Sequence, residues 1–201
     1  MLEIRAKKKL GEFLLDTDLT DEGFICMTGP NGSGKSTFLN IVAGTLALDE
    51  GFVKLSARDI TALPPEKRET VLVTPDSYIP HLPVDKHLEW GARVKNLKID
   101  HEFVGKVKTA LGISYSDRLI RLSLGMRERV ALGTALLSKP RLILIDETFS
   151  NIDNRQLFVS EFRKLCSEAK IEVIFTTQFG EDANSSDHGY LMAGGKLKKL
   201  F

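Results

Sequence analysis

The chain has 201 residues, with 28 Lys and Arg against 27 Asp and Glu and a formal net charge of +1. This length fits one domain, or one domain with an inserted lobe, and the charge balance excludes the broad basic field of nucleic-acid-binding proteins, so no nucleic acid is expected among its partners. No apolar run approaches the roughly 18 residues of a membrane-spanning helix, and the N-terminus lacks the apolar segment of a signal peptide.

The N-terminal residues predict antiparallel strands. Leu2, Ile4 and Ala6 alternate with charged residues, which indicates an edge strand. A turn at 9–12 follows, and 13–16 predict a second strand of the same hairpin. Further along the chain we expect a turn at 49–51, strands at 52–55 and 71–73, and a proline-containing loop at 63–66.

A glycine-rich stretch, GPNGSGKST at 29–37, fits the phosphate-binding pattern G-x-x-x-x-G-K-[ST]. An apolar strand pattern at 24–28 precedes it, and helical spacing follows it as far as about Gly44. Glycines let backbone N–H groups approach phosphate oxygens, and the helix N-terminus adds partial positive charge. Lys35 is expected to reach the β- and γ-phosphates of a nucleotide, and Ser36 to ligate Mg²⁺. The expected nucleotide-binding residues are Gly29, Pro30, Asn31, Gly32, Ser33, Gly34, Lys35, Ser36 and Thr37.

The two cysteines predict no metal site. Cys26 lies in the apolar strand before the glycine loop, so a buried free thiol is expected there. Cys26 and Cys166 lack the spacing of metal ligands and fit a reducing, cytosolic compartment.

From Pro75 to about Leu137 the apolar residues take helical spacing. Helices are expected around 84–92, 103–111 and 130–136, and Trp90 is expected in the core because large aromatic side chains are mostly buried. This pattern predicts a single domain, with a helical lobe at about 76–137 inserted into a core lobe at about 1–75 and 138–201.

Further strands and one helix follow the helical segment. Residues 141–147 place Asp146 and Glu147 directly after four consecutive apolar residues, the pattern of a buried strand. Open α/β sheets bind ligands at the carboxyl ends of such strands. A helix pattern at 157–165, a strand pattern at 171–176 and a closing hairpin at 190–195 complete an α/β chain.

Five motifs stand in the order found in ATP-binding subunits of ABC transporters, and nearly the whole chain resembles them. Residues 29–37 resemble Walker A, and LSLGM at 122–126 with the helix after it resembles the signature motif LSGGQ. Residues 145–147 resemble Walker B, 150–153 the D-loop, and 191–197 the terminal hairpin. The resemblance implies a P-loop NTPase (RecA-like) core with an antiparallel β edge and an inserted helical lobe, and ATP and Mg²⁺ as cofactors.

The resemblance also implies roles for single residues. Two subunits are expected to close head to tail around two ATP molecules, with Ser123 and Gly125 of one capping the γ-phosphate held by the other. Glu147 would be the general base and Asp146 would orient the Mg²⁺ shell, with Lys35 binding the phosphates. Asp153 would lie at the interface between subunits.

Three positions depart from the family pattern. Asp76 stands where the family has a glutamine; it can still ligate Mg²⁺, but with a different reach. Gln178 stands in place of a catalytic histidine and can hydrogen-bond the γ-phosphate without carrying a proton. Thr148 replaces the proline after the catalytic glutamate. The usual adenine-stacking tyrosine is not evident, and either Leu10 or Phe13 could replace it.

Two classes of function remain open on these residues. The first is an ATPase that powers transport through a separate transmembrane permease and lies on the inner face of the cell membrane through that permease. Loop and edge segments at 2–13 and 59–68 are similar to archaeal molybdate/tungstate-type importer ATPases, which suggests an oxyanion cargo. The alternative is a degenerate switch subunit that binds ATP with weak or no hydrolysis, or a non-transport ABC protein. Asp76 and Gln178 favour this alternative, whereas Lys35, Ser123 and Glu147 favour the ATPase.

Overall fold

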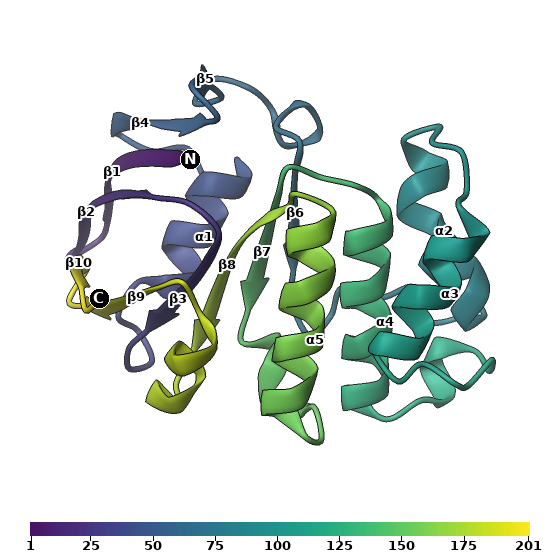
Figure 1. Ribbon diagram of the computed structural model, residues 1–201. Coiled ribbons are helices and arrows are strands. Elements are labelled where there is room, and N and C mark those ends of the chain that lie inside the picture. Colours follow the sequence, from purple (N-terminus) through teal and green to yellow (C-terminus); the bar gives the residue numbers. More distant parts are fainter.

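The computed structural model describes residues 1–201, and its N-terminal part is an antiparallel sheet (Figure 1). Strands β1 (Leu2–Leu10) and β2 (Phe13–Asp21) form the predicted hairpin. β1 also pairs with β4 (Glu50–Leu55), and β5 (Arg58–Asp59) follows, so the strand order is β2-β1-β4-β5. The expectation of an edge strand at the N-terminus is therefore wrong. The alternation of side chains shows which face of a strand is buried. It does not show whether a neighbouring strand pairs with each edge, because that pairing is made by the backbone.

The turn expected at 49–51 is also partly wrong, because β4 already begins at Glu50. Gly51 lies against β1, and a Cβ atom at this position would stand 2.0 Å from the carbonyl oxygen of Arg5. Its positive φ of 112° adds a second reason for glycine. This glycine therefore permits a close approach of two strands instead of marking a turn.

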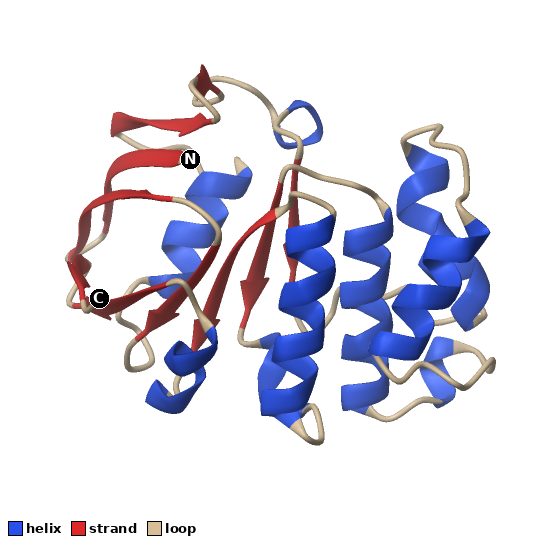
Figure 2. Cartoon of the chain, in the orientation of Figure 1, coloured by secondary structure: helices blue, strands red, loops and turns tan.

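A second, mainly parallel sheet forms the centre of the molecule (Figure 2). Its strand order is β10-β9-β3-β8-β7-β6, and only β10 is antiparallel to its neighbour. The apolar runs recognised in the sequence become strands buried on both faces, as parallel sheets require. The strands are β3 (Phe24–Thr28), β6 (Thr70–Val73), β7 (Leu142–Asp146), β8 (Glu172–Thr177), β9 (His188–Ala193) and β10 (Lys196–Lys199).

Helices cover both faces of the central sheet. Helix α1 (Lys35–Ala43) lies between the two sheets, and α4 (Leu124–Leu137) and α5 (Arg155–Glu168) cover the opposite face (Figure 1). α2 (Val84–Val94) packs on α4, and α3 (His101–Ala110) contacts both α4 and α5. Short 3₁₀ helices complete the chain as η1 (Pro65–Lys67), η2 (Leu119–Arg121), η3 (Thr148–Asn151) and η4 (Gly180–Ser185). No helix has the length and apolar character needed to cross a membrane.

The side chain of Trp90 lies on the surface, 46% exposed, so its expected core position is wrong. The buried face of α2 carries Val84, His87, Leu88 and Ala92, which follow helical spacing. Trp90 is two positions from Leu88 and therefore points away from that face. Both cysteines, in contrast, are buried free thiols, and burial raises the pKa of Cys26 to about 12.

Arg68 ties the end of α1 to the loop before β6. Its side chain is buried, and its guanidinium donates to the carbonyls of Ile41 (2.8 Å), Val42 (3.0 Å), Thr61 (2.6 Å) and Leu63 (2.7 Å). Two of these carbonyls belong to the last turn of α1, where helical partners are missing. Arg68 thereby fixes the C-terminal end of the helix whose N-terminus follows the glycine loop.

We predict that Arg68→Met lowers the free energy of unfolding by about 2–4 kcal/mol, because several buried carbonyls lose their donor. Urea denaturation measures this change. Arg58→Met is the matched control, since that arginine is exposed and pairs only with Glu69 at 3.4 Å; a surface pair of this kind contributes about 0–1 kcal/mol. Equal losses in the two variants would contradict the role of Arg68.

Candidate nucleotide-binding site

A cleft of about 730 Å³ opens where α1 begins and β7 ends. Its volume suits a nucleotide-sized ligand. It lies at the carboxyl end of parallel strands, as predicted from the position of the acidic pair. The cleft is lined by Leu10, Phe13, Asn31, Gly32, Gly34, Lys35, Ser36, Thr37, Pro75, Asp146 and Glu147.

The glycine loop is held from behind by the terminal hairpin. Gly29 has a φ of 149°, and a Cβ atom there would stand 2.2 Å from the carbonyl oxygen of Met192. The backbone N–H of Gly195 donates to the carbonyl of Ser33 at 3.0 Å, while the Gly195 carbonyl accepts from Asp16 of β2 at 2.8 Å. At Gly32, with a φ of 74°, a Cβ atom would meet nothing within 4 Å. The loop therefore has a packed rear face and an open front face toward the cleft.

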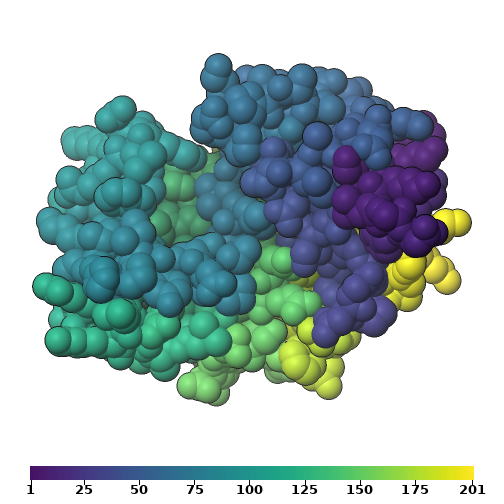
Figure 3. All heavy atoms as spheres, turned by 180° about the vertical axis from the view of Figure 1, so that it is seen from behind, coloured from purple at the N-terminus to yellow at the C-terminus, as the bar shows by residue number.

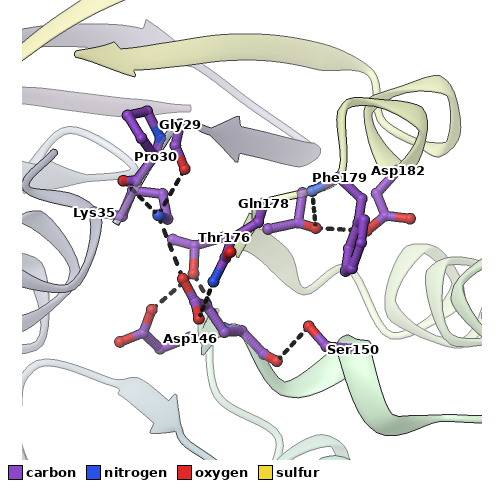
Figure 4. Close-up of polar contacts among 11 residues, drawn as sticks. Gly29, Pro30, Lys35, Asp146, Ser150, Thr176, Gln178, Phe179 and Asp182 are labelled. Carbon is purple, nitrogen blue, oxygen red and sulfur yellow. Dashed lines mark hydrogen bonds and ion pairs between the residues drawn. The ribbon is translucent and has the colours of Figure 1, made fainter. Parts of the chain in front are cut away.

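Lys35 is buried at the base of the cleft, with 4% of its side chain exposed. Its ammonium donates to the carbonyls of Gly29 at 2.9 Å and Pro30 at 3.1 Å (Figure 4). It also forms an ion pair with Glu147 Oε1 at 3.3 Å. The glycine loop and the end of β7 thus meet at one positive charge.

Glu147 is held through both its side chain and its backbone. Its Oε2 accepts from Gln178 Nε2 at 3.0 Å, so the structure brings together Lys35, Glu147 and Gln178, the three predicted catalytic residues. Its φ of 53° is left-handed, a conformation that costs a non-glycine residue about 1 kcal/mol. The backbone N–H donates to Thr176 Oγ1 at 3.0 Å, and the carbonyl accepts from Ser150 Oγ at 3.0 Å.

The segment around Gln178 is anchored by buried polar contacts. Thr177 Oγ1 donates to Asp182 Oδ2 at 2.6 Å, and Asp182, itself buried, is paired with Arg155 of α5 at 2.8 Å. The Arg155 guanidinium also lies 4.3 Å from the centre of the Phe179 ring. Gln178 therefore sits between two anchored neighbours while its own side chain remains exposed.

The remaining predicted site residues lie outside this cleft. Ser123 is exposed and caps α4, accepting from the backbone N–H of Met126 at 3.3 Å. Gly125 lies against η3, because a Cβ atom there would stand 2.3 Å from the carbonyl oxygen of Asn151. Asp76 is exposed in the turn after β6, although its neighbour Pro75 lines the cleft. The structure thus places one predicted Mg²⁺ ligand, Asp76, apart from the other two, Ser36 and Asp146.

Thr148 occupies the position of the family's proline and is fully buried. Its hydroxyl is within hydrogen-bond distance of the Asp146 carbonyl at 3.1 Å and of the Val73 carbonyl at 3.4 Å. Thr148 thus links the end of β7 to β6 through a side-chain contact that proline cannot make.

Glu128 was not recognised from the sequence, where it looks like an ordinary charged helix residue. It is 1% exposed, its Oε1 accepts from Asn151 Nδ2 at 2.9 Å, and its Oε2 has no partner. Burial raises the pKa of this carboxyl to about 7. Arg129, the next residue, donates to the carbonyl of Asp153 at 2.8 Å. The helix after the signature motif therefore contacts the D-loop at two points.

A sequence model of the family described as ABC transporter matches residues 15–150. The molybdate/tungstate import ATP-binding protein of Archaeoglobus fulgidus is 36% identical to the chain, and the alignment covers 100% of the chain and 89% of that protein. The chain belongs to the ABC transporter family. It is therefore an ATPase of the ABC type, which confirms the resemblance recognised from the five motifs.

Other relatives are longer than the chain. The molybdate/tungstate import ATP-binding protein of Pyrococcus horikoshii is 36% identical over 89% of the chain, and the Fe(3+) ions import ATP-binding protein of Streptomyces avermitilis is 34% identical over 91%. The chain spans only a little over half of these two proteins, 54% and 55%.

Solved structures confirm the predicted fold class. An ATP-binding cassette of an ABC transporter in its ADP conformation superposes with a TM-score of 0.80 at 24% identity, covering 98% of the chain and 89% of that structure. A dimeric cassette in a post-hydrolysis state superposes with a TM-score of 0.81 at 22% identity, covering 100% and 99% respectively. At these identities the likeness shows the P-loop NTPase fold alone.

We predict that Glu128→Gln stabilises the chain increasingly as the pH rises from about 4.5 to about 7. The raised folded-state pKa means that the folded protein holds this proton more tightly than the unfolded chain. The stability contributed by the protonated carboxyl is full below the unfolded pKa and is lost as the pH passes the folded pKa. Gln keeps the Asn151 contact without a charge, so the difference should approach the order of 3 kcal/mol at pH 8.

Thermal and urea unfolding of both proteins between pH 4.5 and 8 measures this difference. Effects of all other titrating groups cancel between the two proteins. The exposed Glu102 offers a control, since Glu102→Gln should give a difference that varies little with pH. A Glu128→Gln difference that stays constant across this range would show that Glu128 is ionised in its buried position.

Proposed function

We propose that the chain is the ATP-binding and ATP-hydrolysing subunit of an importer, that it acts with a separate membrane permease, and that its cargo is a molybdate- or tungstate-like oxyanion. The alignment of the whole chain with the Archaeoglobus fulgidus protein at 36% identity carries the cargo assignment. A relative named for import of Fe(3+) ions supports import more generally, and one named for transport of sulfoquinovosyl glycerol supports a role in transport.

The cleft offers a triphosphate the groups that it needs. The open face of the glycine loop and the N-terminus of α1 present backbone N–H groups to anionic oxygens. Lys35 would exchange its contacts with the loop carbonyls and Glu147 for contacts with the β- and γ-phosphates. Leu10 and Phe13 line the same cleft, so either side chain can pack against the adenine ring.

The cleft also carries oxygen ligands suited to Mg²⁺. The Ser36 hydroxyl and the Asp146 carboxylate both line it, and hard oxygen donors of this kind are what Mg²⁺ prefers. No group of three or more His, Cys, Asp or Glu side chains is arranged to hold a metal ion, so most other ligands would come from the phosphates and water. When bound, the ion neutralises charge on the phosphates. Asp76 would act only from its exposed turn beside Pro75.

Glu147 is the residue that would accept a proton from the attacking water. In the structure its carboxylate is engaged by Lys35 and by Gln178. Once Lys35 turns to the phosphates, the carboxylate has one oxygen available to water while Gln178 still orients the other. The amide of Gln178 can hold this geometry but cannot itself take up the proton.

The exposed N-terminal end of α4 would meet a second ATP-binding subunit. Ser123 and Asp153 are exposed and lie outside the cleft of their own chain. The contacts of Glu128 with Asn151 and of Arg129 with Asp153 keep these two segments together. One subunit would therefore present the signature motif and the D-loop to its partner as a single surface.

An apolar groove gives the permease a place to dock on the cytoplasmic side of the membrane. The groove, of about 340 Å³, lies between β6 and helices α2 and α4, and the exposed Trp90 and Val94 stand at its rim. Figure 3 shows the surface hollowed between the teal helical segment and the blue N-terminal part. If the chain divides into the expected helical lobe and core lobe, this groove would lie at their junction.

We predict that Glu147→Gln lowers ATP hydrolysis at least about a hundredfold, the usual order for loss of a general base, while ATP affinity stays within about threefold. Phosphate release and titration with a fluorescent ATP analogue measure the two quantities. Glu181→Gln, which changes an exposed glutamate of η4, is the matched control. Unchanged hydrolysis in Glu147→Gln would place the base elsewhere.

The cargo is tested in vesicles that contain the chain and a candidate permease. Molybdate or tungstate, supplied with its binding protein, should stimulate hydrolysis, whereas Fe³⁺ and sulfate should not. Stimulation by Fe³⁺ alone would overturn the oxyanion assignment and leave the ATPase assignment in place.

A second candidate function is an ATP-binding switch with little hydrolysis, and Gln178 is the observation that favours it. We predict a low basal ATPase that Gln178→His raises several-fold, because histidine can contact both Glu147 and the γ-phosphate and can titrate near neutral pH. Steady-state phosphate release at saturating Mg-ATP measures the effect. If the rate is unchanged or lower, this position does not limit turnover.

A further inference from the structure

Thr176 stands at the carboxyl end of β8, directly beside Asp146 in the parallel pairing with β7. Its side chain is 1% exposed and does not line the nucleotide cleft. Its hydroxyl lies 2.7 Å from Asp146 Oδ1 and 3.0 Å from the backbone nitrogen of Glu147 (Figure 4). One buried atom therefore contacts both residues of the acidic pair.

The two hydrogen bonds run in opposite senses. The Thr176 hydroxyl donates its proton to the Asp146 carboxylate and accepts the backbone N–H of Glu147. A hydroxyl has one proton and two lone pairs, so it can make both bonds at once. Valine has the same shape as threonine but can make neither bond.

Each bond restricts a different degree of freedom. The first holds one carboxylate oxygen of Asp146, whose side chain lines the cleft. The second holds the backbone of Glu147 in its left-handed conformation, with φ at 53°, and so fixes the direction in which that side chain leaves the chain. The orientation of both carboxylates thus depends on a residue that does not line the cleft.

We propose that Thr176 is a positioning residue for ATP hydrolysis, acting through Asp146 on Mg-ATP binding and through Glu147 on the attacking water. This inference rests on the roles proposed above for those two carboxylates. Supporting residues that orient a metal ligand or a general base typically change affinity or rate by about 10- to 100-fold when they are removed.

The next residue provides a matched comparison. Thr177 is also buried, but its hydroxyl donates to Asp182 at 2.6 Å. Successive side chains of a strand point to opposite sides, so the two hydroxyl groups serve different neighbours. Thr177→Val removes a buried hydroxyl from the same strand without touching Asp146 or Glu147.

The experiment compares Thr176→Val, Thr176→Ala and Thr176→Ser with Thr177→Val. The first readout is the gain in ATP affinity on adding Mg²⁺, measured by calorimetry with a non-hydrolysable analogue, and the second is steady-state hydrolysis. In the Val and Ala variants the Mg²⁺-dependent gain in affinity should fall at least fivefold, and kcat should fall about tenfold or more. Their affinity for the analogue without Mg²⁺ should stay within about twofold.

Thr176→Ser retains the hydroxyl and should stay within about threefold of wild type in both readouts. Thr177→Val should keep the Mg²⁺-dependent gain. The inference is overturned if Ala and Val match wild type, or if Ser loses as much as they do, since the retained hydroxyl would then not preserve function. Absence of Mg²⁺-dependent binding in the wild type would overturn the proposed function together with the inference, whereas normal values in the Val variant overturn the inference alone.

Discussion

A buried ammonium group, that of Lys35, constrains the whole nucleotide cleft. A buried charge must keep polar partners, and here the partners are two carbonyls of the glycine loop and the carboxylate of Glu147. Phosphate oxygens can replace all three. All polar contacts of the ammonium group thus come from the chain itself, and in the proposed function a nucleotide would bind by replacing them. The same replacement would release Glu147, so that binding of the nucleotide would make the proposed base available.

The sequence predicted those parts of the fold that follow from local pattern. The glycine loop, the apolar strands and the helices appear where their periodicity indicated, because burial imposes that periodicity. The predictions that were wrong concern residues whose position depends on contacts with segments distant in the sequence. Pairing on both edges of β1 and the strand position of Gly51 are set by backbone contacts with distant segments. Trp90 is exposed because only one face of α2 meets α4.

The sequence predicts the site residues that belong to a known motif. It does not predict the residues that hold them in place from other segments of the chain. Lys35, Glu147 and Gln178 do come together, although their catalytic roles stay predictions, as do the lobe boundaries. Thr176 and Glu128 could not be recognised, since a threonine in a strand and a glutamate in a helix are common at such positions. Their importance arises from contacts across at least 23 residues of sequence, with Asp146 and Asn151.

The support of the glycine loop by the terminal hairpin bears on how the protein is made. The loop is synthesised before the residues that support it, Met192 and Gly195, which come much later in the sequence. Its strand, β3, also waits for both of its neighbours, β8 and β9. Such late, long-range pairings delay folding. A nascent chain would therefore expose the phosphate-binding motif before its supports are made, and ATP binding would require the segment that contains Met192 and Gly195.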